Sequence, residues 1–187
     1  MHAELQALLD AVAACERDAE ALVAPLDESS VNQVRRAGTW SVAQCINHLT
    51  LMNEFYLRGW HDAVANARAR GAMSFNGLRP TLIGRWFVRS MEPPVKMRAR
   101  AIAVVTPPPT TIPHAGLVDA YKMSHDRYRD LVRAAADIDV NRIVRPNAIV
   151  PSVKMRLATV LLVIPAHDRR HLWQAARVSA DVARRSN

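Results

Sequence analysis

The sequence predicts an all-α fold, a four-helix bundle with a long, proline-rich crossover between its second and third helices. Two observations support this prediction. Apolar residues recur at steps of three and four over four long segments, which is the spacing of an amphipathic helix. The alternating strands that an α/β fold needs are not recognisable between them. Since 50% of the 187 residues are hydrophobic and 22% are charged, we expect residues 1–187 to form a single domain.

We place the first helix from about Ala3 to Val23, because Pro25 cannot continue it. A polar link then leads to Ser41, an N-cap whose hydroxyl can accept a hydrogen bond from an amide of the next turn. The second helix follows, and we expect it to run to about Arg70. Its inward stripe is Val42, Cys45, Ile46, Leu49, Met52, Asn53, Tyr56 and Trp60.

Residues 71–113 break the helical pattern and form the predicted crossover. Six of the eleven prolines lie in residues 93–113. A short apolar segment occupies residues 82–91, and residues 95–105 alternate loosely enough for a short strand. The three prolines at 107–109 favour a stiff connector instead, so we assign this region no firm structure.

The third helix is predicted from about residue 115 to 137, with weak caps. After a loop that contains Pro146 and Pro151, the last helix is predicted over residues 154–184. Pro165 lies inside it, two residues before a histidine. Because proline has no amide hydrogen, we expect a kink there that could turn this histidine away from its partners.

The net charge of +8 is unevenly distributed. Acidic residues outnumber arginines in residues 1–70, whereas residues 71–187 carry the basic excess. The two cysteines, Cys15 and Cys45, lie in apolar helical patterns without metal-site spacing, which favours a reducing compartment. The first residues lack a secretory pattern, and the longest apolar run is far shorter than a membrane span. We therefore expect a cytoplasmic protein that does not span a membrane.

Two histidines, His167 and His171, interrupt the apolar stripe of the last helix. At positions i and i+4 their side chains project side by side, so both imidazoles can reach one cation. The second helix offers His48 at the border of its own stripe. Metal sites in helical bundles are built from facing helices in this way, and three imidazoles leave a position open for water or substrate. We therefore predict a divalent metal site at His48, His167 and His171.

Simpler interpretations stay open for these residues and their neighbours. The histidines of the last helix could be core residues that bond to other groups, and Cys45 is expected to be a small buried apolar residue. Asp168 is expected on the flank of the helix, paired with arginine or solvent, or less readily bonded to His171. His125 could line the site, but exposure on the surface is the expectation. Gln174 and Tyr128 are left without a role, and Trp40, Trp60 and Trp173 are expected to be core or interface residues. Trp86 and Phe87, which lie among arginines, would suit base stacking or an interfacial helix if the basic half binds a partner.

Several well-known catalytic motifs are absent from the sequence. It contains no HExxH, no GxGxxG, no GxxxxGK[ST] and no GxSxG. If the protein is a hydrolase, a bound metal must generate the nucleophile by lowering the pKa of a water molecule.

Two stretches resemble the DinB-like (DinB/YfiT-like) superfamily of metalloenzymes. Residues 39–49, TWSVAQCINHL, are similar to its helix-opening W-S-x-x-x-x-x-x-H-L motif, and residues 166–175, AHDRRHLWQA, to its closing H-x-x-x-H-x-x-Q helix. The resemblance implies a four-helix bundle that holds nickel or zinc with three histidines, which map onto His48, His167 and His171. Relatives include transferases and isomerases that use low-molecular-weight bacterial thiols, and proteins described as metal-dependent hydrolases. Family members often dimerise.

The leading hypothesis is thus a metal-dependent hydrolase or thiol S-transferase, a homodimer whose substrate is small and anionic or thiol-conjugated. Basic residues of the crossover would line the mouth of the site, with Glu92 the single acid among them: Arg79, Arg85, Arg89, Lys96, Arg98 and Arg100. The alternative is a non-catalytic bundle, with or without metal, whose basic half binds an anionic partner. Such a partner would be nucleic acid, an acidic protein or a membrane surface. Nucleic acid is not expected, since no nucleic-acid-binding motif is recognisable, and a membrane is not expected as a partner either.

Overall fold

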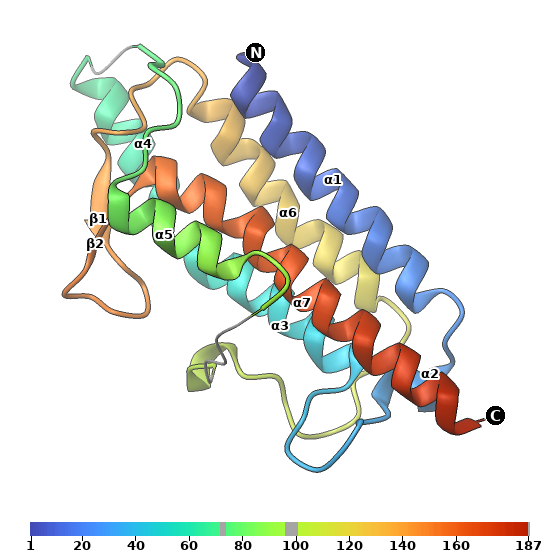
Figure 1. Cartoon of the computed structure of the whole chain (residues 1–187). Helices are drawn as coiled ribbons and strands as arrows, with labels where there is room; N and C mark the ends of the chain where they lie inside the picture. The colour runs from blue at the N-terminus through green and yellow to red at the C-terminus, as the bar shows by residue number, and fades with distance from the viewer. Residues whose placement is uncertain (72–73, 96–100, 187) are drawn as a thin grey trace.

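The computed structural model describes residues 1–71, 74–95 and 101–186, and its four long helices lie side by side (Figure 1). They are α1 (Ala3–Val23), α3 (Val42–Leu57), α6 (Leu117–Ala134) and α7 (Leu157–Ser186). Helices α1 and α3 each pack against both α6 and α7. The predicted all-α fold is confirmed, and none of the helices in the described ranges is long and apolar enough to cross a membrane.

A capping box fixes the start of α3, as the sequence predicts. The Ser41 Oγ accepts a hydrogen bond from the Gln44 amide at 3.1 Å, and the Gln44 Oε1 accepts one from the Ser41 amide at 3.1 Å. The box places Trp40 just before the helix and His48 in its second turn.

The prediction of one continuous helix to Arg70 is wrong. Helix α3 ends at Leu57, and α4 (Trp60–Ala69) begins after a break. Gly59 has φ = 71°, a left-handed conformation that residues with a side chain rarely adopt, and its carbonyl accepts a hydrogen bond from the Arg145 guanidinium at 2.8 Å. The polar link before α3 also contains a short helix, α2 (Glu28–Asn32).

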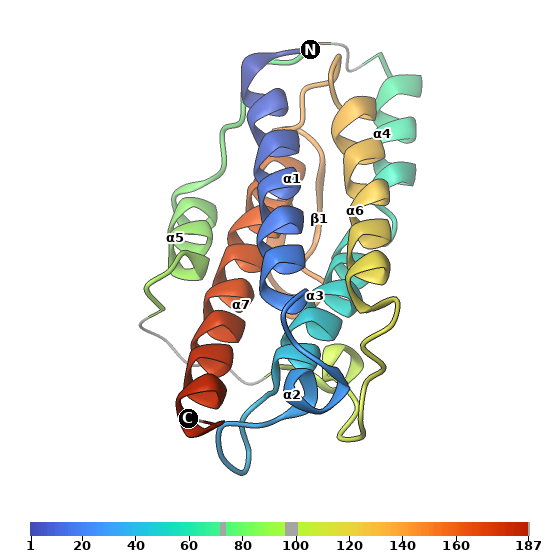
Figure 2. The ribbon, with the colours of Figure 1, turned by 90° about the vertical axis from the view of Figure 1, so that its right-hand side faces the viewer.

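The crossover contains helix α5 (Leu82–Met91) and a 3₁₀ turn, η1 (Ala103–Val105). Figure 2 shows α5 on the outer side of α7, and a Cβ on Gly84 would stand 2.7 Å from the Thr159 Oγ1, so the two helices approach closely. The loosely predicted strand over 95–105 is not found where the structure describes it, and residues 96–100 lie outside the described residues.

A two-stranded antiparallel hairpin, β1 (Val144–Pro146) and β2 (Lys154–Arg156), precedes the last helix. This hairpin is not predicted from the sequence, and α7 accordingly begins at Leu157 rather than at Lys154. The strands are three residues long, too short for a period of two to be recognised.

Helix α7 continues through Pro165. Proline leaves the carbonyl four residues earlier without its helical hydrogen bond. That carbonyl belongs to Leu161, and it accepts a hydrogen bond from the Tyr128 hydroxyl of α6 at 2.6 Å. A side chain from a neighbouring helix thus replaces the bond that proline removes, and the histidine after Pro165 is not turned away from its partners.

The apolar core consists of two clusters, one toward each end of the four long helices. The first includes Leu5, Leu131 and Leu161, and the second includes Ala19, Ile46 and Leu172. Between them the four long helices contribute buried polar side chains, which we call the polar layer: Glu16, His48, Asn53, Ser124, His125, His167, Asp168 and His171.

Candidate metal centre

The polar layer brings together the three histidines that the sequence predicts as metal ligands. His48 comes from α3, and His167 and His171 lie one turn apart on α7. One ligand nitrogen from each ring lies within 4.8 Å of those of the other two, and all three residues are buried. The ring centroid of His48 lies 5.3 Å from that of His167 and 4.5 Å from that of His171. One cation can therefore contact all three rings.

The backbone of the crossover sets the orientation of His48. Its Nδ1 lies 2.7 Å from the Val105 carbonyl oxygen in η1. Because a carbonyl can only accept, Nδ1 carries the proton and donates it. The Nε2 of His48 therefore keeps its lone pair, which is the form of imidazole that binds a metal.

The other two rings have buried polar atoms that the protein does not satisfy. Within the described residues, the Nδ1 atoms of His167 and His171 have no hydrogen-bond partner. A buried polar atom without a hydrogen-bond partner normally lowers the stability of the fold by on the order of 1–3 kcal/mol. A cation bound between the rings, or its water ligands, would offset this loss.

Burial keeps the rings neutral. It lowers the pKa of His171 to about 3, with the charges of His48 and Arg170 acting in the same direction. It also lowers the pKa of His167 well below the ordinary value, and the neighbouring His171, His48 and Arg170 act in the same direction. The pKa of His48 is lowered by burial, although the hydrogen bond to Val105 opposes the shift. Neutral imidazoles are the ligands that zinc and nickel take.

The three residues between the α7 histidines each attach the helix to another part of the molecule. Asp168 accepts a hydrogen bond from His125 of α6 at 2.7 Å. The Arg169 Nε donates to the Glu92 carboxylate at 2.9 Å, and the Arg170 guanidinium donates to the Ser90 carbonyl at 3.2 Å. These contacts fix the rotation of α7 about its axis, and with it the direction of both histidines.

The predictions for Asp168 and His125 are wrong. Both residues have 0% exposed surface, and they belong to a charged cluster in which His125 donates to Asp168 and, at 2.9 Å, to the Glu16 carboxylate. The signal was present in the sequence. His125 lies four residues after Tyr121 and three before Tyr128, and Asp168 lies four before Leu172, so both positions fall on buried stripes.

Burial alone would lower the pKa of His125, but hydrogen bonds and charge from Asp168 and Glu16 outweigh it and raise the pKa to about 9. The pKa of Glu16 is lowered, since bonds from His125 and Arg129 overcome the cost of burial. The layer therefore holds a charged histidine between carboxylates in addition to the three neutral ones.

A comparison with family models decides the relationship of this protein to others. The model described as the DinB superfamily matches residues 11–175, which cover most of the chain and all three histidines. The chain belongs to the DinB superfamily. Neither the curated proteins nor the solved structures gave a match.

In this DinB-superfamily protein an aromatic side chain borders the histidine cluster. The half-buried ring of Trp40 has its centroid 4.7 Å from that of His48 and 5.8 Å from that of His171. Gln174 lies three residues after His171 on the same helix, and its side chain acts to raise the pKa of His171 against the effect of burial. Both residues come from the two motifs that carry the family resemblance.

Cys45 lies one turn before His48 and is fully buried, as predicted. Burial raises the pKa of its thiol to about 12, so the thiolate that metals prefer is disfavoured there. Among the described residues, the group able to hold a metal consists of the three histidines without Cys45.

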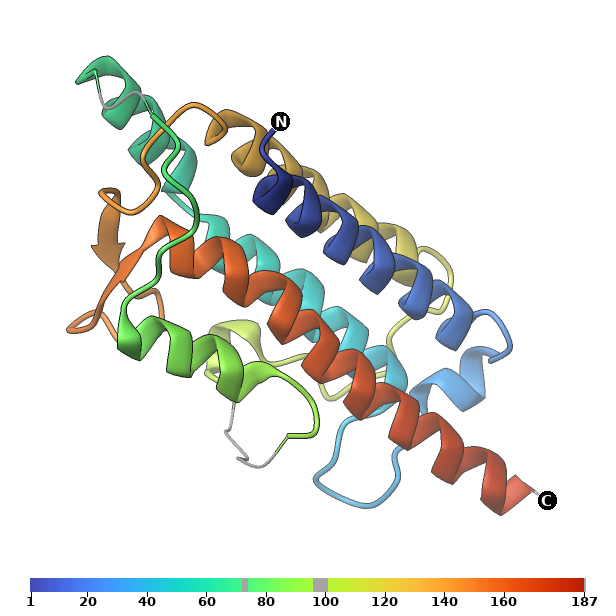
Figure 3. The same ribbon diagram turned by 45° about the horizontal axis from the view of Figure 1, so that its top comes forward.

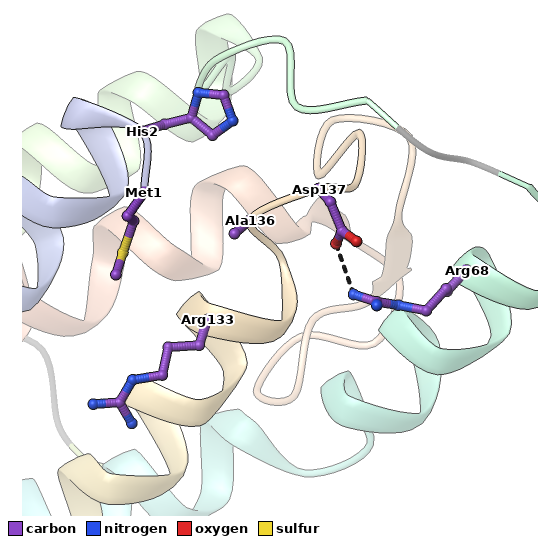
Figure 4. A pocket seen from close by; sticks show the side chains of 6 residues that line it. All are labelled: Met1, His2, Arg68, Arg133, Ala136 and Asp137. Atoms are coloured by element: carbon purple, nitrogen blue, oxygen red, sulfur yellow. Dashed lines mark hydrogen bonds and ion pairs between the residues drawn. The ribbon is translucent and has the colours of Figure 1, made fainter.

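The basic residues predicted at the mouth are only partly described. Arg79, Arg85 and Arg89 lie exposed at or on α5, and Lys96, Arg98 and Arg100 lie outside the described residues. A separate hollow near the N-terminus is lined by a single histidine, His2, and so has no group of histidines like that of the candidate metal centre (Figure 4). Its lining includes Arg68, which is engaged by Asp137 at 2.6 Å.

Proposed function

We propose that this DinB-superfamily protein is a metal-dependent enzyme in which His48, His167 and His171 hold one divalent ion, nickel or zinc. The observation that carries the proposal is the convergence of three buried, neutral imidazoles from two helices, with ligand nitrogens within 4.8 Å of one another. Imidazole is a preferred ligand of both metals.

When bound, such an ion with three protein ligands keeps an open position at which a water molecule or a thiolate is activated as a nucleophile. The residues of the chain supply the rest. Val105 holds His48 in the ligating tautomer, and the contacts of Asp168, Arg169 and Arg170 aim the α7 pair. The ring of Trp40 borders the cluster on the side of His48 and His171. This arrangement supports hydrolysis or transfer of a low-molecular-weight thiol to a small anionic substrate.

Elemental analysis of untagged protein tests the metal site. We expect about one equivalent of nickel or zinc in the wild type and its loss in the double variant His167→Ala/His171→Ala. The double variant His2→Ala/His61→Ala is a matched control, because it removes two imidazoles that lie outside the cluster. A wild type that is metal-free and takes up neither added zinc nor added nickel would overturn the proposal.

Turnover separates the enzyme from a non-catalytic metal protein. The metal-loaded wild type is screened with activated esters and amides, and with small electrophiles in the presence of low-molecular-weight thiols. We expect metal-dependent turnover that His48→Ala abolishes. Metal bound at full occupancy without turnover in either screen would favour the interaction bundle instead.

A further inference from the structure

Helix α5 exposes three large apolar side chains within one turn. Leu82, Ile83 and Trp86 are 75%, 72% and 59% exposed. The opposite face of α5 is the one in contact with the protein, since Gly84 is buried against Thr159 of α7, and Phe87 and Val88 pack on the apolar core. The outward side of α5 is therefore an apolar surface rather than a part of the core.

The same outward side is basic. Arg85 and Arg89 are exposed and, with Leu82, Trp86 and Ser90, line a hollow on the surface. Helix α5 contains no acidic residue, and Glu92, which follows it, is engaged by Arg169. We call Leu82, Ile83, Arg85, Trp86 and Arg89 the α5 patch.

The β1–β2 hairpin, which lies beside the start of α5, also combines exposed apolar side chains with basic residues. The Arg156 guanidinium donates to the Arg79 carbonyl at 3.1 Å, and both Figure 1 and Figure 3 show the hairpin and the start of α5 at the same end of the bundle. Val150 and Val153 are 48% and 44% exposed. Residues 79–91 and 144–156 together contain no Asp or Glu, and their exposed basic residues are Arg79, Arg85, Arg89 and Lys154. The half-buried Arg145 instead donates to the Gly59 carbonyl and lies over the ring of Trp60.

The charge of this surface selects its partner. A second copy of the chain, related by a twofold axis through the α5 patch, would place the same two arginines against each other without an acid on α5 to offset them. A surface that combines protruding apolar side chains, a tryptophan and arginines has the composition of helices that lie in the interface of an anionic bilayer. There the apolar side chains enter the acyl boundary and the arginines meet the lipid headgroups.

We infer that the α5 patch, with the adjoining hairpin, docks this protein reversibly on anionic lipid surfaces. The contact is peripheral, since one short helix inserts few side chains. None of the three histidines of the metal site belongs to the patch.

Co-sedimentation of the full chain with lipid vesicles tests this inference. We expect binding to vesicles of equal parts phosphatidylglycerol and phosphatidylcholine, little binding to phosphatidylcholine alone, and weakening with salt. The variants Leu82→Gln/Ile83→Gln and Arg85→Gln/Arg89→Gln should each lose roughly tenfold or more in affinity. All four side chains are exposed, so circular dichroism should show unchanged helix content.

Two controls make the same chemical changes elsewhere. Met123→Gln/Val34→Gln removes exposed apolar side chains, and Arg17→Gln/Arg127→Gln removes two exposed charges; both should bind as the wild type does. Failure of the wild type to bind anionic vesicles at low salt, or an equal loss in the controls, would overturn the inference. So would tighter binding of a single-stranded polynucleotide that the α5 variants abolish, which would identify the patch as a nucleic-acid surface.

Discussion

His125 is the residue whose environment differs most from a simple interpretation of the sequence. Its ring has 0% exposed surface and donates one hydrogen bond to Asp168 and one to Glu16. Arg129 also contacts Glu16, so the cluster joins α1, α6 and α7 through charged groups. A buried cation of this kind is stable only while its carboxylate partners are present.

The titration of His125 predicts how stability changes above neutral pH. Its pKa is raised from 6.5 to about 9 in the folded state. A raised pKa contributes stability that is fully present below pH 6.5 and is lost as the pH rises to about 9, by an amount on the order of 3 kcal/mol. The histidines of the metal site do not mask this loss. Their pKa values are lowered in the folded state, so above pH 6.5 they are neutral in both the folded and the unfolded protein and add no further pH dependence.

We therefore expect the free energy of unfolding, measured with denaturant, to fall between pH 6.5 and pH 9 in the wild type. His125→Gln should be less stable at pH 6.5 and should show a flatter profile over this interval. His61→Gln changes a histidine outside the polar layer and should keep the wild-type slope. A wild-type profile that is level or rises over this interval would contradict the assignment of a charged His125.

At the scale of the elements, α6 and α7 are joined where proline interrupts the hydrogen bonds of α7. Tyr128→Phe removes the donor to the Leu161 carbonyl and leaves it unsatisfied in the core, at an expected cost of about 1–3 kcal/mol in the free energy of unfolding. Pro165→Ala introduces a backbone amide that can bond to the same carbonyl. Tyr128→Phe should therefore lower the free energy of unfolding less in the Pro165→Ala background than in the wild type.

A double-mutant cycle with denaturant unfolding measures this coupling. Additive losses would show that the hydroxyl of Tyr128 and the amide introduced at position 165 do not serve the same carbonyl. A larger loss in the Pro165→Ala background would contradict the explanation outright.

The elements that the sequence predicts well are those whose ends are set by residues within or next to them in the chain. Helix α1 begins and ends at the predicted residues, and the Ser41–Gln44 capping box fixes the start of α3. The break at Gly59 was missed because the apolar spacing continues across it to Trp60, while its carbonyl is held by Arg145 from far along the chain. The hairpin was missed because its strands are three residues long and include Pro146.

The same distinction applies to the candidate site. His167 and His171 share one helix face, so their proximity follows from spacing, and the buried stripe of α3 carries His48 toward them. The partners of Asp168 lie on α6 and those of Arg169 and Arg170 near the end of α5. Helical periodicity describes a face but not which helix covers it, so these contacts could not be predicted.

At the scale of the whole molecule, the polar layer lies between two apolar clusters and crosses all four long helices. Three neutral rings with two unsatisfied nitrogens are costly in this position, and a ligand that binds only the folded layer shifts the unfolding equilibrium of the entire chain. Zinc or nickel should therefore raise the thermal midpoint of the wild type. The stabilisation should be about 2.7 kcal/mol when the metal concentration is 100 times the dissociation constant.

Differential scanning calorimetry with matched ions distinguishes this linkage from nonspecific binding of cations to acidic side chains. Magnesium prefers oxygen ligands and should leave the midpoint unchanged, whereas zinc and nickel should raise it and a chelator should reverse the effect. His48→Ala should remove the response, since two imidazoles on one helix turn give a much weaker site than three. His61→Ala should retain it, as His61 bonds to the Arg127 carbonyl outside the layer. A response to zinc that survives His48→Ala would place the ion elsewhere and leave the three rings as a buried polar layer of the bundle.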